Sequence, residues 1–460
     1  MFDLKNYKNI YMIGIGGISM SGIAHILKSW DFLVSGSNNE ENNMTDELSN
    51  AGIKVYIGHD YNNITNDIDL VVYTAAIKDD NPELVHARKL NIPVMERGLF
   101  LGELTKLFKD TIGISGTHGK TTTTSMVSLC FLEGNLDPSI QVGSVLNSIN
   151  GNYRVGKSDY FIIEACEYCD SFLNFKERSA IVLNIDNDHL DYFKTFDNIK
   201  KSFIKYVSML PSDGVLVING DDKNCLDLAL HTKAKVITYG FNENNNYYAK
   251  NIKFNEDGYA SYDLYKKDKF LSRINLSVPG RHNILNSLAC VSLCMFYNID
   301  IESIKKGLKS YTGAARRFEY KGMFNGAKVY DDYGHHPTEV SAVSEAVHNK
   351  KYNKSWVIFE PHTYSRVKEH YKTFAKSLVN FDNIIITDIY AAREKNVDNV
   401  SPEMIIDELK KLGKVSIHIS SFDDILNYLK DRVEEDDIIL TLGAGYVTKL
   451  SNMLTKKEFN

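Results

Sequence analysis

The chain contains 460 residues, of which 43% are hydrophobic and 24% charged, and its formal net charge is −6. At about 150 residues per domain this length suggests roughly three domains, and the ordinary composition excludes disorder along the whole chain. General nucleic-acid-binding and membrane-surface proteins are usually basic, so the acidic excess argues against both kinds of partner. The sequence shows no secretory signal and no apolar stretch of the roughly 20 residues that span a bilayer, which predicts a cytoplasmic protein.

In chain order, short β-branched segments alternate with helical patterns. Three of these segments, residues 9–14, 111–115 and 437–442, run into glycine turns. Further predicted strands cover residues 160–163, 180–183, 215–218, 356–359 and 383–386, and helical patterns cover residues 123–132 and 283–297. Continuous apolar strands are typical of parallel sheets covered on both faces, so we predict an α/β protein.

Changes of pattern along the chain predict three domains, covering residues 1–109, 110–312 and 313–460. Residues 241–275 are polar, rich in asparagine and tyrosine, and partly alternating. This pattern favours an antiparallel hairpin insert within the second domain.

The first glycine turn, Gly14 to Gly22, resembles a dinucleotide-binding fingerprint. Ser19 replaces its third glycine, and the later segment Ser35 to Asn38 lacks the carboxylate that would hold a ribose hydroxyl. A dehydrogenase is therefore disfavoured. Two interpretations remain, namely a diphosphate held by backbone N–H groups and a tight turn packed against a helix.

The second glycine turn has the features of a phosphate-binding loop. Gly116 and Gly119 precede Lys120 and Thr121, between a predicted strand and a predicted helix. Lysine can reach the β and γ phosphates and the threonine hydroxyl can bind Mg²⁺. The motif is incomplete, because Ile114 occupies the position of its first glycine. An ordinary strand–helix turn does not account for the glycines, the lysine and the threonine run together.

Polar residues follow the next two predicted strands. Glu164 and Glu167 follow residues 160–163, and a segment from Asn184 to His189 follows residues 180–183. Neighbouring parallel strands place their carboxyl ends at one sheet edge, where a carboxylate can hold Mg²⁺. An imidazole such as that of His189 suits Mn²⁺ better.

The six cysteines show no disulfide framework and are expected to be reduced. Only Cys166 and Cys169 have the spacing of a zinc or redox pair, and no second pair accompanies them. A metal or redox role is therefore disfavoured.

Eight segments occur in the order found in the Mur ligases, so the chain resembles this family over nearly its whole length: GIGGISMSG, GTHGKTT, EACE, NIDNDHLDYF, PGRHNILN, GAARRFE, DDYGHHPTE and EPHTYSR. The resemblance implies a Rossmann-like N-terminal domain for a UDP-sugar, a central P-loop ATPase domain with a mostly parallel sheet, and a C-terminal Rossmann-like ligase domain. It also implies a monomer or homodimer that uses ATP to join L-alanine to the carboxylate of UDP-N-acetylmuramate. This step of peptidoglycan synthesis would pass through an acyl phosphate and release ADP and phosphate.

The same resemblance assigns site residues by position. ATP would contact Gly116, Thr117, His118, Gly119, Lys120, Thr121, Thr122, His282, Asn283, Asn286 and Arg317. Mg²⁺ or Mn²⁺ would bind Thr121, Glu164 and His189. The UDP-sugar would contact Gly16, Gly17, Ser37, His59 and Arg97, and the amino acid would contact Tyr333, His335, His362 and Arg366. Catalysis is assigned to Lys120, Glu164, His189, Arg317, Asp332 and His335, with Arg317 and Asp332 completing the ATP site on domain closure.

Several positions depart from the family pattern or have simpler interpretations. Cysteines 166 and 169 stand where many relatives have carboxylates, Asn38 where Asp is often found, and Thr363 where some relatives have Arg. Asn283 can be a helix cap, residues 316–317 a solvated arginine pair, and residues 335–336 turn residues before a helix. Either His335 or His362 can accept the amine proton.

Rival functions also remain open at this point. A sister ligase would add a preformed tripeptide or a later residue, and a folate-glutamate ligase shares the core domains. A dehydrogenase and a non-enzymatic phosphate-loop switch are the alternatives from other classes.

Overall fold

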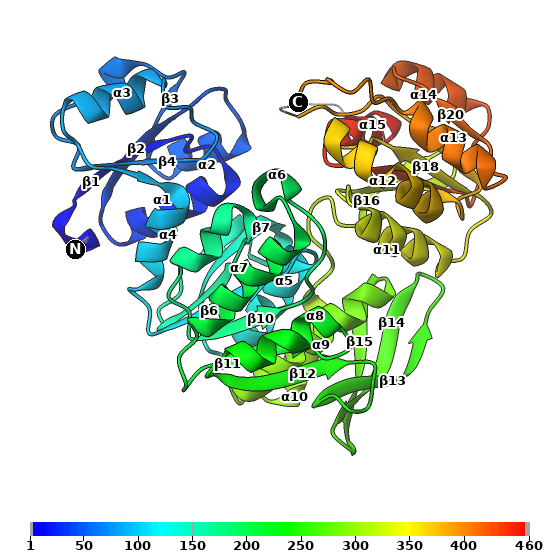
Figure 1. Ribbon diagram of the computed structural model, residues 1–460, viewed down its shortest axis with the longest axis horizontal. Helices are drawn as coiled ribbons and strands as arrows, with labels where there is room; N and C mark the ends of the chain where they lie inside the picture. Colours follow the sequence, from blue (N-terminus) through cyan, green and yellow to red (C-terminus); the bar gives the residue numbers. More distant parts are fainter. Residues whose placement is uncertain (1–2, 150, 393, 456–460) are drawn as a thin grey trace. The chain divides into compact units, whose positions relative to one another are not determined.

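The computed structural model describes residues 3–149, 151–392 and 394–455, which form an α/β protein with three sheets (Figure 1). By compactness the chain divides into two units. One comprises residues 1–249, 264–272 and 285–311, and the other residues 250–263, 273–284 and 312–460. Within the described ranges, no helix combines the length and the apolar character needed to cross a membrane.

The first sheet is fully parallel and has the order β3-β2-β1-β4-β5. This is the order of a doubly wound nucleotide-binding fold, whose ligands bind where the order reverses beside β1. Ile10 and Met12 point into one apolar core and Tyr11 and Ile13 into another, as alternation along a strand buried on both faces requires. The elements are β1 (Asn9–Ile13), α1 (Ile18–Ser29), β2 (Leu33–Asn38), α2 (Asn43–Asn50), β3 (Lys54–Ile57), β4 (Leu70–Tyr73), α3 (Pro82–Lys89), β5 (Val94–Glu96) and α4 (Arg97–Thr105).

The second sheet has ten strands in the order β15-β14-β13-β12-β11-β10-β6-β9-β7-β8. Strand β6 lies between β9 and β10 and is parallel to both, so the carboxyl ends of these three strands meet at one edge. The elements up to β12 are β6 (Asp110–Ser115), α5 (Lys120–Glu133), β7 (Ser139–Leu146), β8 (Gly151–Arg154), β9 (Tyr160–Glu164), β10 (Ser179–Val182), α6 (Leu190–Phe193), α7 (Phe196–Ser208), β11 (Val215–Asn219), α8 (Lys223–Leu228) and β12 (Lys235–Gly240).

The predicted antiparallel insert is confirmed at the far edge of this sheet. Strand β14 turns into β15 through only two residues, a connection that only antiparallel strands can make. The remaining elements of this region are β13 (Tyr247–Phe254), β14 (Tyr259–Lys266), β15 (Lys269–Pro279), α9 (Arg281–Phe296) and α10 (Ile301–Ser310).

The third sheet has the order β16-β17-β21-β18-β19-β20, parallel except for the edge strand β16. One apolar core covers a face with residues of α11, α12 and α13, and a second core covers the opposite face with residues of α14 and α15. The elements are β16 (Glu319–Phe324), β17 (Ala327–Asp332), α11 (Pro337–His348), β18 (Ser355–Phe359), α12 (Tyr364–Leu378), β19 (Asn383–Ile386), α13 (Glu403–Lys411), β20 (Ser416–His418), α14 (Phe422–Lys430), β21 (Ile438–Leu442) and α15 (Val447–Leu454).

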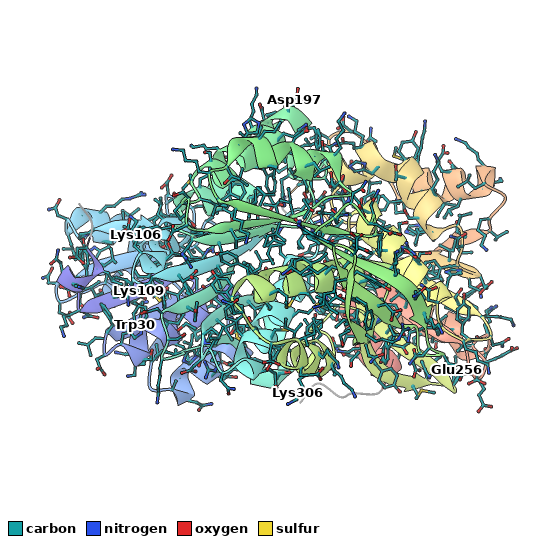
Figure 2. All side chains as sticks on the ribbon, turned by 90° about the horizontal axis from the view of Figure 1, so that it is seen from below. Trp30, Lys106, Lys109, Asp197, Glu256 and Lys306 are labelled. Carbon is teal, nitrogen blue, oxygen red and sulfur yellow. The ribbon has the colours of Figure 1, made fainter. Side chains whose placement is uncertain are left out.

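Long charged side chains cover the outside of these layers. Asp197, Glu256 and Lys306, for example, are exposed, as Figure 2 shows. The central strands of the sheets, such as β1, β6 and β18, lie beneath them and are buried almost throughout, as the continuous apolar runs predict.

Candidate active site

The phosphate loop connects β6 to α5. Gly116 and Gly119 have φ angles of 128° and 86°, which side-chain-bearing residues rarely adopt. A Cβ on Gly119 would lie 2.7 Å from Oδ1 of Asn286, so this position has no room for a side chain. Helix α5 begins at Lys120, three residues before its predicted start, and its first N–H groups form an anion site.

Residues after β10 hold this loop in shape. Asn184 accepts the N–H of His118 at 2.8 Å and donates its own amide to the His118 carbonyl at 3.0 Å. Asp186 donates its N–H to Oγ1 of Thr117 at 2.9 Å, and its carboxylate lies 3.0 Å from Nε2 of His118. The neighbouring strand end therefore fixes the loop conformation, as the predicted meeting of strand ends requires.

Lys120 is paired inside the loop. Its ammonium donates to Oε2 of Glu167 at 2.8 Å and to two loop carbonyls. Burial alone would lower the pKa of Lys120, but the charge and hydrogen bond of Glu167, with a smaller effect of Glu164, outweigh burial and raise it. The ammonium is therefore charged when the loop meets a phosphate.

Oxygen donors for a metal ion lie beside the lysine. Oγ1 of Thr121 donates to Oε2 of Glu164 at 3.2 Å, so the hydroxyl and the carboxylate adjoin one point. The buried Oε1 of Glu167 accepts no hydrogen bond from the described residues and lies 3.8 Å from Nε2 of His189. These hard oxygens fit Mg²⁺, whereas the imidazole is the weaker match.

The residues predicted to face the nucleotide lie around the start of α9. Asn286 is buried and adjoins Gly119, as described above. Asn283 belongs to the first turn of α9 and donates its amide to the Pro279 carbonyl at 2.6 Å, so the helix-cap interpretation is wrong. Nδ1 of His282 is buried without a hydrogen bond among the described residues. Burial, together with the charge of Arg317, lowers the pKa of His282 to about 4.

In the second unit, Asp332 ends β17 and is nearly buried. Its carboxylate accepts the N–H groups of Phe318 and Gly334, each at 2.7 Å. Burial raises the pKa of Asp332 to about 6, against the opposing effects of Arg317 and these two N–H groups. The neighbouring Arg317 lies over the ring of Tyr333, with 5.5 Å from the guanidinium carbon to the ring centroid.

The solvated-pair interpretation of the two arginines is wrong. Arg316 places Nε 3.3 Å from Oδ2 of Asp331 and donates to the carbonyls of the turn that follows β21. Arg317 lies 3.9 Å from Oε1 of Glu339. Arg316 is therefore held by several neighbouring groups, whereas Arg317 is more exposed and its ion pair with Glu339 is long.

The predicted amino-acid residues meet at the carboxyl edge of the third sheet. The rings of His335 and His362 lie 5.1 Å apart. Nη1 of Arg366 donates to Nδ1 of His362 at 2.9 Å, so this nitrogen carries the lone pair. Nδ1 of His335 lies 3.0 Å from the carbonyl of Tyr333, so it carries a hydrogen and Nε2 is the basic nitrogen.

Two neighbours complete this region. His336 is the N-cap of α11, and His335 directly before it donates its N–H to Oε2 of Glu339 at 3.0 Å, so both lie at the helix start as the turn interpretation expects. Thr363, the residue that departs from the family pattern, has φ 63° and ψ 143°. This conformation is costly for a β-branched residue, and such strain concentrates at functional sites.

The predicted UDP-sugar residues Ser37 and His59 meet at a buried carboxylate that the sequence did not reveal. Oε2 of Glu83 accepts the hydroxyl of Ser37 and lies 3.1 Å from Nδ1 of His59. Oε1 accepts from Tyr11 and Asn63, each at 2.8 Å. Ser37 donates its hydroxyl hydrogen to Glu83, so its Oγ acts as an acceptor toward His59. Nδ1 of His59 therefore carries a hydrogen that points to Oγ of Ser37 and Oε2 of Glu83, and Nε2 keeps the lone pair.

The other predicted sugar contacts surround the first glycine turn. Gly17 is the N-cap of α1, and the N–H of Gly16 donates to Oδ1 of Asn38 at 3.3 Å. Nη1 of Arg97 donates to Oγ of Ser19 at 3.2 Å. Ser19, which replaces the third glycine of the dinucleotide fingerprint, thus holds Arg97, one of the residues predicted to contact the UDP-sugar.

Two residues in these networks were not predicted from the sequence: Glu83 and Glu339. Glu83 and Glu339 lie in the first turns of α3 and α11, where a carboxylate is common for helix stability alone. The partners of Glu83 are distant in the sequence, and Arg317, a partner of Glu339, belongs to a different segment of the chain. Asn184, by contrast, belongs to the polar segment that the sequence places after a predicted strand, and it contacts the loop as described above.

The chain matches three family models in succession: "Mur ligase family, catalytic domain" over residues 9–109, "Mur ligase middle domain" over 114–294, and "Mur ligase, glutamate ligase domain" over 316–445. With full-length relatives close to half identical, the chain belongs to the Mur ligase family. The predicted domain limits stay a prediction.

The relatives point to one member of this family. The chain is similar to UDP-N-acetylmuramate–L-alanine ligase of Clostridium acetobutylicum, with 49% identity over 99% of this chain and 100% of that protein. The enzyme of the same name from Acetivibrio thermocellus is 46% identical over 100% and 98%. A crystal structure of UDP-N-acetylmuramate–alanine ligase from Thermotoga maritima matches with a TM-score of 0.81 and 28% identity over 98% of each chain.

Proposed function

We propose that this chain uses ATP to join L-alanine to the carboxylate of UDP-N-acetylmuramate, forming an amide and releasing ADP and phosphate. Relatives with this name cover the full chain. The observation that carries the proposal is the charged Lys120 in a glycine loop beside oxygen donors, the arrangement that phosphoryl transfer needs.

The chemistry follows from the low reactivity of a carboxylate. A carboxylate oxygen attacks the γ phosphorus, and the bond from that phosphorus to ADP breaks, which leaves an acyl phosphate. The amine then attacks the acyl carbon, the bond from carbon to the phosphate oxygen breaks, and the amine loses a proton. We assign Lys120 to the transferring phosphate and propose that Arg317 and Asp332 act there as well.

Mg²⁺ is the proposed metal, held by Thr121 and Glu164 with His189 nearby. When bound, it neutralises phosphate charge. For the amine proton we propose His335 rather than His362. The Nδ1 hydrogen of His335 faces a carbonyl and leaves Nε2 basic, whereas the Nδ1 lone pair of His362 is taken by Arg366.

Replacing Lys120 with Ala tests the phosphate role. We expect phosphate release with UDP-N-acetylmuramate, ATP and L-alanine to fall by at least about 100-fold, because a charge at the transferring group is lost. Thermal unfolding checks the fold, and Lys106→Ala, an exposed lysine, serves as the control. Activity near that of the control would remove Lys120 from the mechanism. Replacing L-alanine by other amino acids or by a tripeptide in the same assay distinguishes the sister ligases.

Replacing Glu164 with Gln tests the metal site. The shape is kept while one negative charge is lost, so we expect half-maximal activity to need at least about 10-fold more Mg²⁺. The exposed Glu256→Gln serves as the control. An unchanged Mg²⁺ titration would exclude Glu164 as a ligand.

A further inference from the structure

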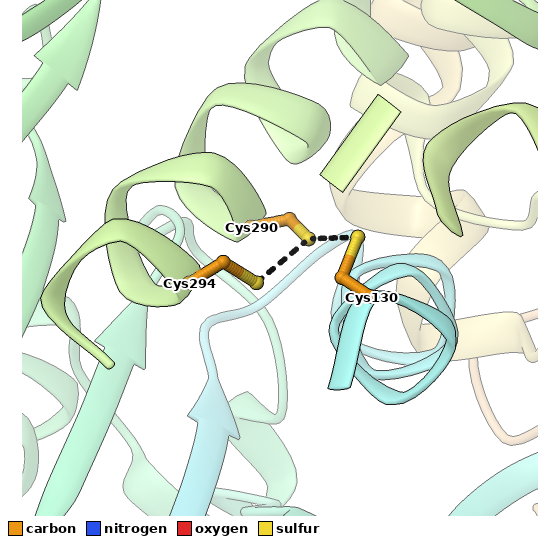
Figure 3. Close-up of side chains that lie close together, drawn as sticks. All are labelled: Cys130, Cys290 and Cys294. Atoms are coloured by element: carbon orange, nitrogen blue, oxygen red, sulfur yellow. Dashed lines mark hydrogen bonds between the residues drawn. The ribbon is translucent and has the colours of Figure 1, made fainter. Parts of the chain in front are cut away.

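Three cysteines with no part in the proposed reaction lie together in the core of the first unit (Figure 3). Cys130 belongs to α5, while Cys290 and Cys294 are one turn apart on α9 and share a helix face. All three are fully buried and reduced. The sequence did not predict this cluster, because Cys130 is 160 residues away from Cys290 in the chain.

The sulfurs point toward one another. Sγ of Cys290 lies 3.6 Å from Sγ of Cys130 and 3.8 Å from Sγ of Cys294, as Figure 3 shows, and all three sulfurs lie within 4.8 Å. A point equidistant from such a triangle is about 2.1–2.4 Å from each sulfur, and a metal–thiolate bond measures about 2.3 Å. An ion at the centre would therefore reach all three sulfurs while the two helices stay in place.

The donor set selects the class of ion. Sulfur ligands favour soft ions such as Cu(I) over Mg²⁺ or Ca²⁺. Zn²⁺ takes four ligands in structural sites, and the described residues offer no fourth His, Cys, Asp or Glu atom to this cluster. A single positive charge is also balanced by one thiolate, which limits the charge placed in an apolar core.

We propose that Cys130, Cys290 and Cys294 form a binding site for a soft monovalent ion of the Cu(I) class. On binding, at least one S–H bond breaks and its proton passes to the buffer, while no electron changes hands. The site is distinct from the proposed magnesium site, since it contains no oxygen donor side chain.

The location of the cluster connects it to the phosphate loop. Helix α5 begins with Lys120, and α9 carries Asn286 beside Gly119. An ion bound by both helices would therefore connect α5, which follows the phosphate loop, with α9, which contacts it. Because only the folded chain brings the sulfurs together, binding should also raise the thermal unfolding temperature.

The test is an anaerobic titration of the full-length chain with Cu(I) supplied as its bicinchoninate complex, whose loss of colour counts the ions transferred. Cys166 and Cys169 can bind copper themselves, so the starting protein carries C166S and C169S. We expect this protein to take up one Cu(I) per chain and to unfold at a higher temperature afterwards. Adding C290S should abolish both effects. Adding C225S should abolish neither, since Cys225 is equally buried but lies outside the cluster.

Two results would overturn the proposal: no uptake by the starting protein, or equal uptake after C290S. Circular dichroism and melting of the copper-free variants check that they fold. If C290S fails this check, C294S replaces it, and retained uptake there is equally decisive because two sulfurs leave the ion without its third ligand.

Discussion

At the scale of single residues, Glu83 is the central acceptor of a hydrogen-bond network in the region of the first sheet. Its carboxylate is fully buried and takes four hydrogen bonds, which uses the acceptor capacity of both oxygens. A buried charge so completely bonded is stable, whereas loss of an acceptor leaves donors unpaired. By fixing the ring of His59, it determines which nitrogen that ring presents to a ligand.

Replacing Glu83 with Gln keeps the shape but turns one acceptor end into a donor. We expect KM for UDP-N-acetylmuramate to rise about 10-fold, corresponding to about 1.4 kcal/mol, while KM for ATP is unchanged. The nitrogen-15 shifts of His59 should show a changed tautomer balance, which general destabilisation would not produce. The exposed Glu41→Gln is the control. A parallel rise in both KM values would show that Glu83 only supports the fold.

Sequence could not reveal this network. Asn81 and Pro82 mark a helix start, and a glutamate in the first turn is explained by the helix dipole alone. Its partners Tyr11 and Ser37 are distant in the chain. Lys120 and Glu164, by contrast, were predictable, since Lys120 belongs to a glycine-loop motif after one buried strand and Glu164 stands at the carboxyl end of its neighbour.

At the scale of elements, α5 and α10 approach each other at Gly307. A Cβ on Gly307 would lie 2.6 Å from Cα and 2.7 Å from the backbone nitrogen of Cys130. These are backbone atoms, so a side chain can enter only if the helices separate.

The Gly307→Ala substitution therefore measures this approach. Alanine favours a helix by up to about 1 kcal/mol over glycine, but we expect a net destabilisation of about 1–3 kcal/mol from overpacking. Urea unfolding gives the difference, with the exposed neighbour Lys306→Ala as the control. An increase in stability would mean that the two helices can separate easily.

The central strands β1, β6 and β21 were predictable because short β-branched apolar runs that end in glycine turns are typical of buried parallel strands, whereas the exposed edge strand β3 lacks this pattern. The start of α5 was not, since Lys120 to Thr122 look like loop residues and the cap is a glycine in a left-handed conformation. Which helices touch, and hence the sulfur cluster, depends on tertiary packing that periodicity does not encode.

At the scale of the whole molecule, two buried groups of the second unit oppose each other in their pH dependence. The pKa of Asp332 rises from 3.8 to about 6, so between these values the folded chain holds a proton that the unfolded chain has lost. The contribution of Asp332 to the free energy of unfolding therefore falls as the pH rises. The pKa of His282 falls from 6.5 to about 4, so the unfolded chain holds the extra proton and stability rises with pH.

The wild type should therefore show little net slope from this pair between pH 4 and 6. Relative to wild type, Asp332→Asn should gain stability as pH rises through this range, and His282→Gln should lose it, each by about 2 kcal/mol. Urea unfolding at pH 4.5, 5.5 and 6.5 measures both differences, in which the other titrating groups cancel. If the stability difference from wild type changed with pH in the same direction in both variants, the opposite pKa shifts of Asp332 and His282 would be wrong.

Because Lys120 is paired with Glu167, any anion that binds the loop has to compete with this carboxylate for the ammonium. A single anion such as inorganic phosphate gains little there, because it must first displace a carboxylate already in contact with the ammonium. If a triphosphate binds there with a divalent cation, as we propose, the positive charge of the cation would compensate the Glu167 carboxylate that the lysine leaves. On the same proposal, Glu167 would pair with Lys120 again once the product leaves, so one carboxylate would both disfavour stray anions and favour product release.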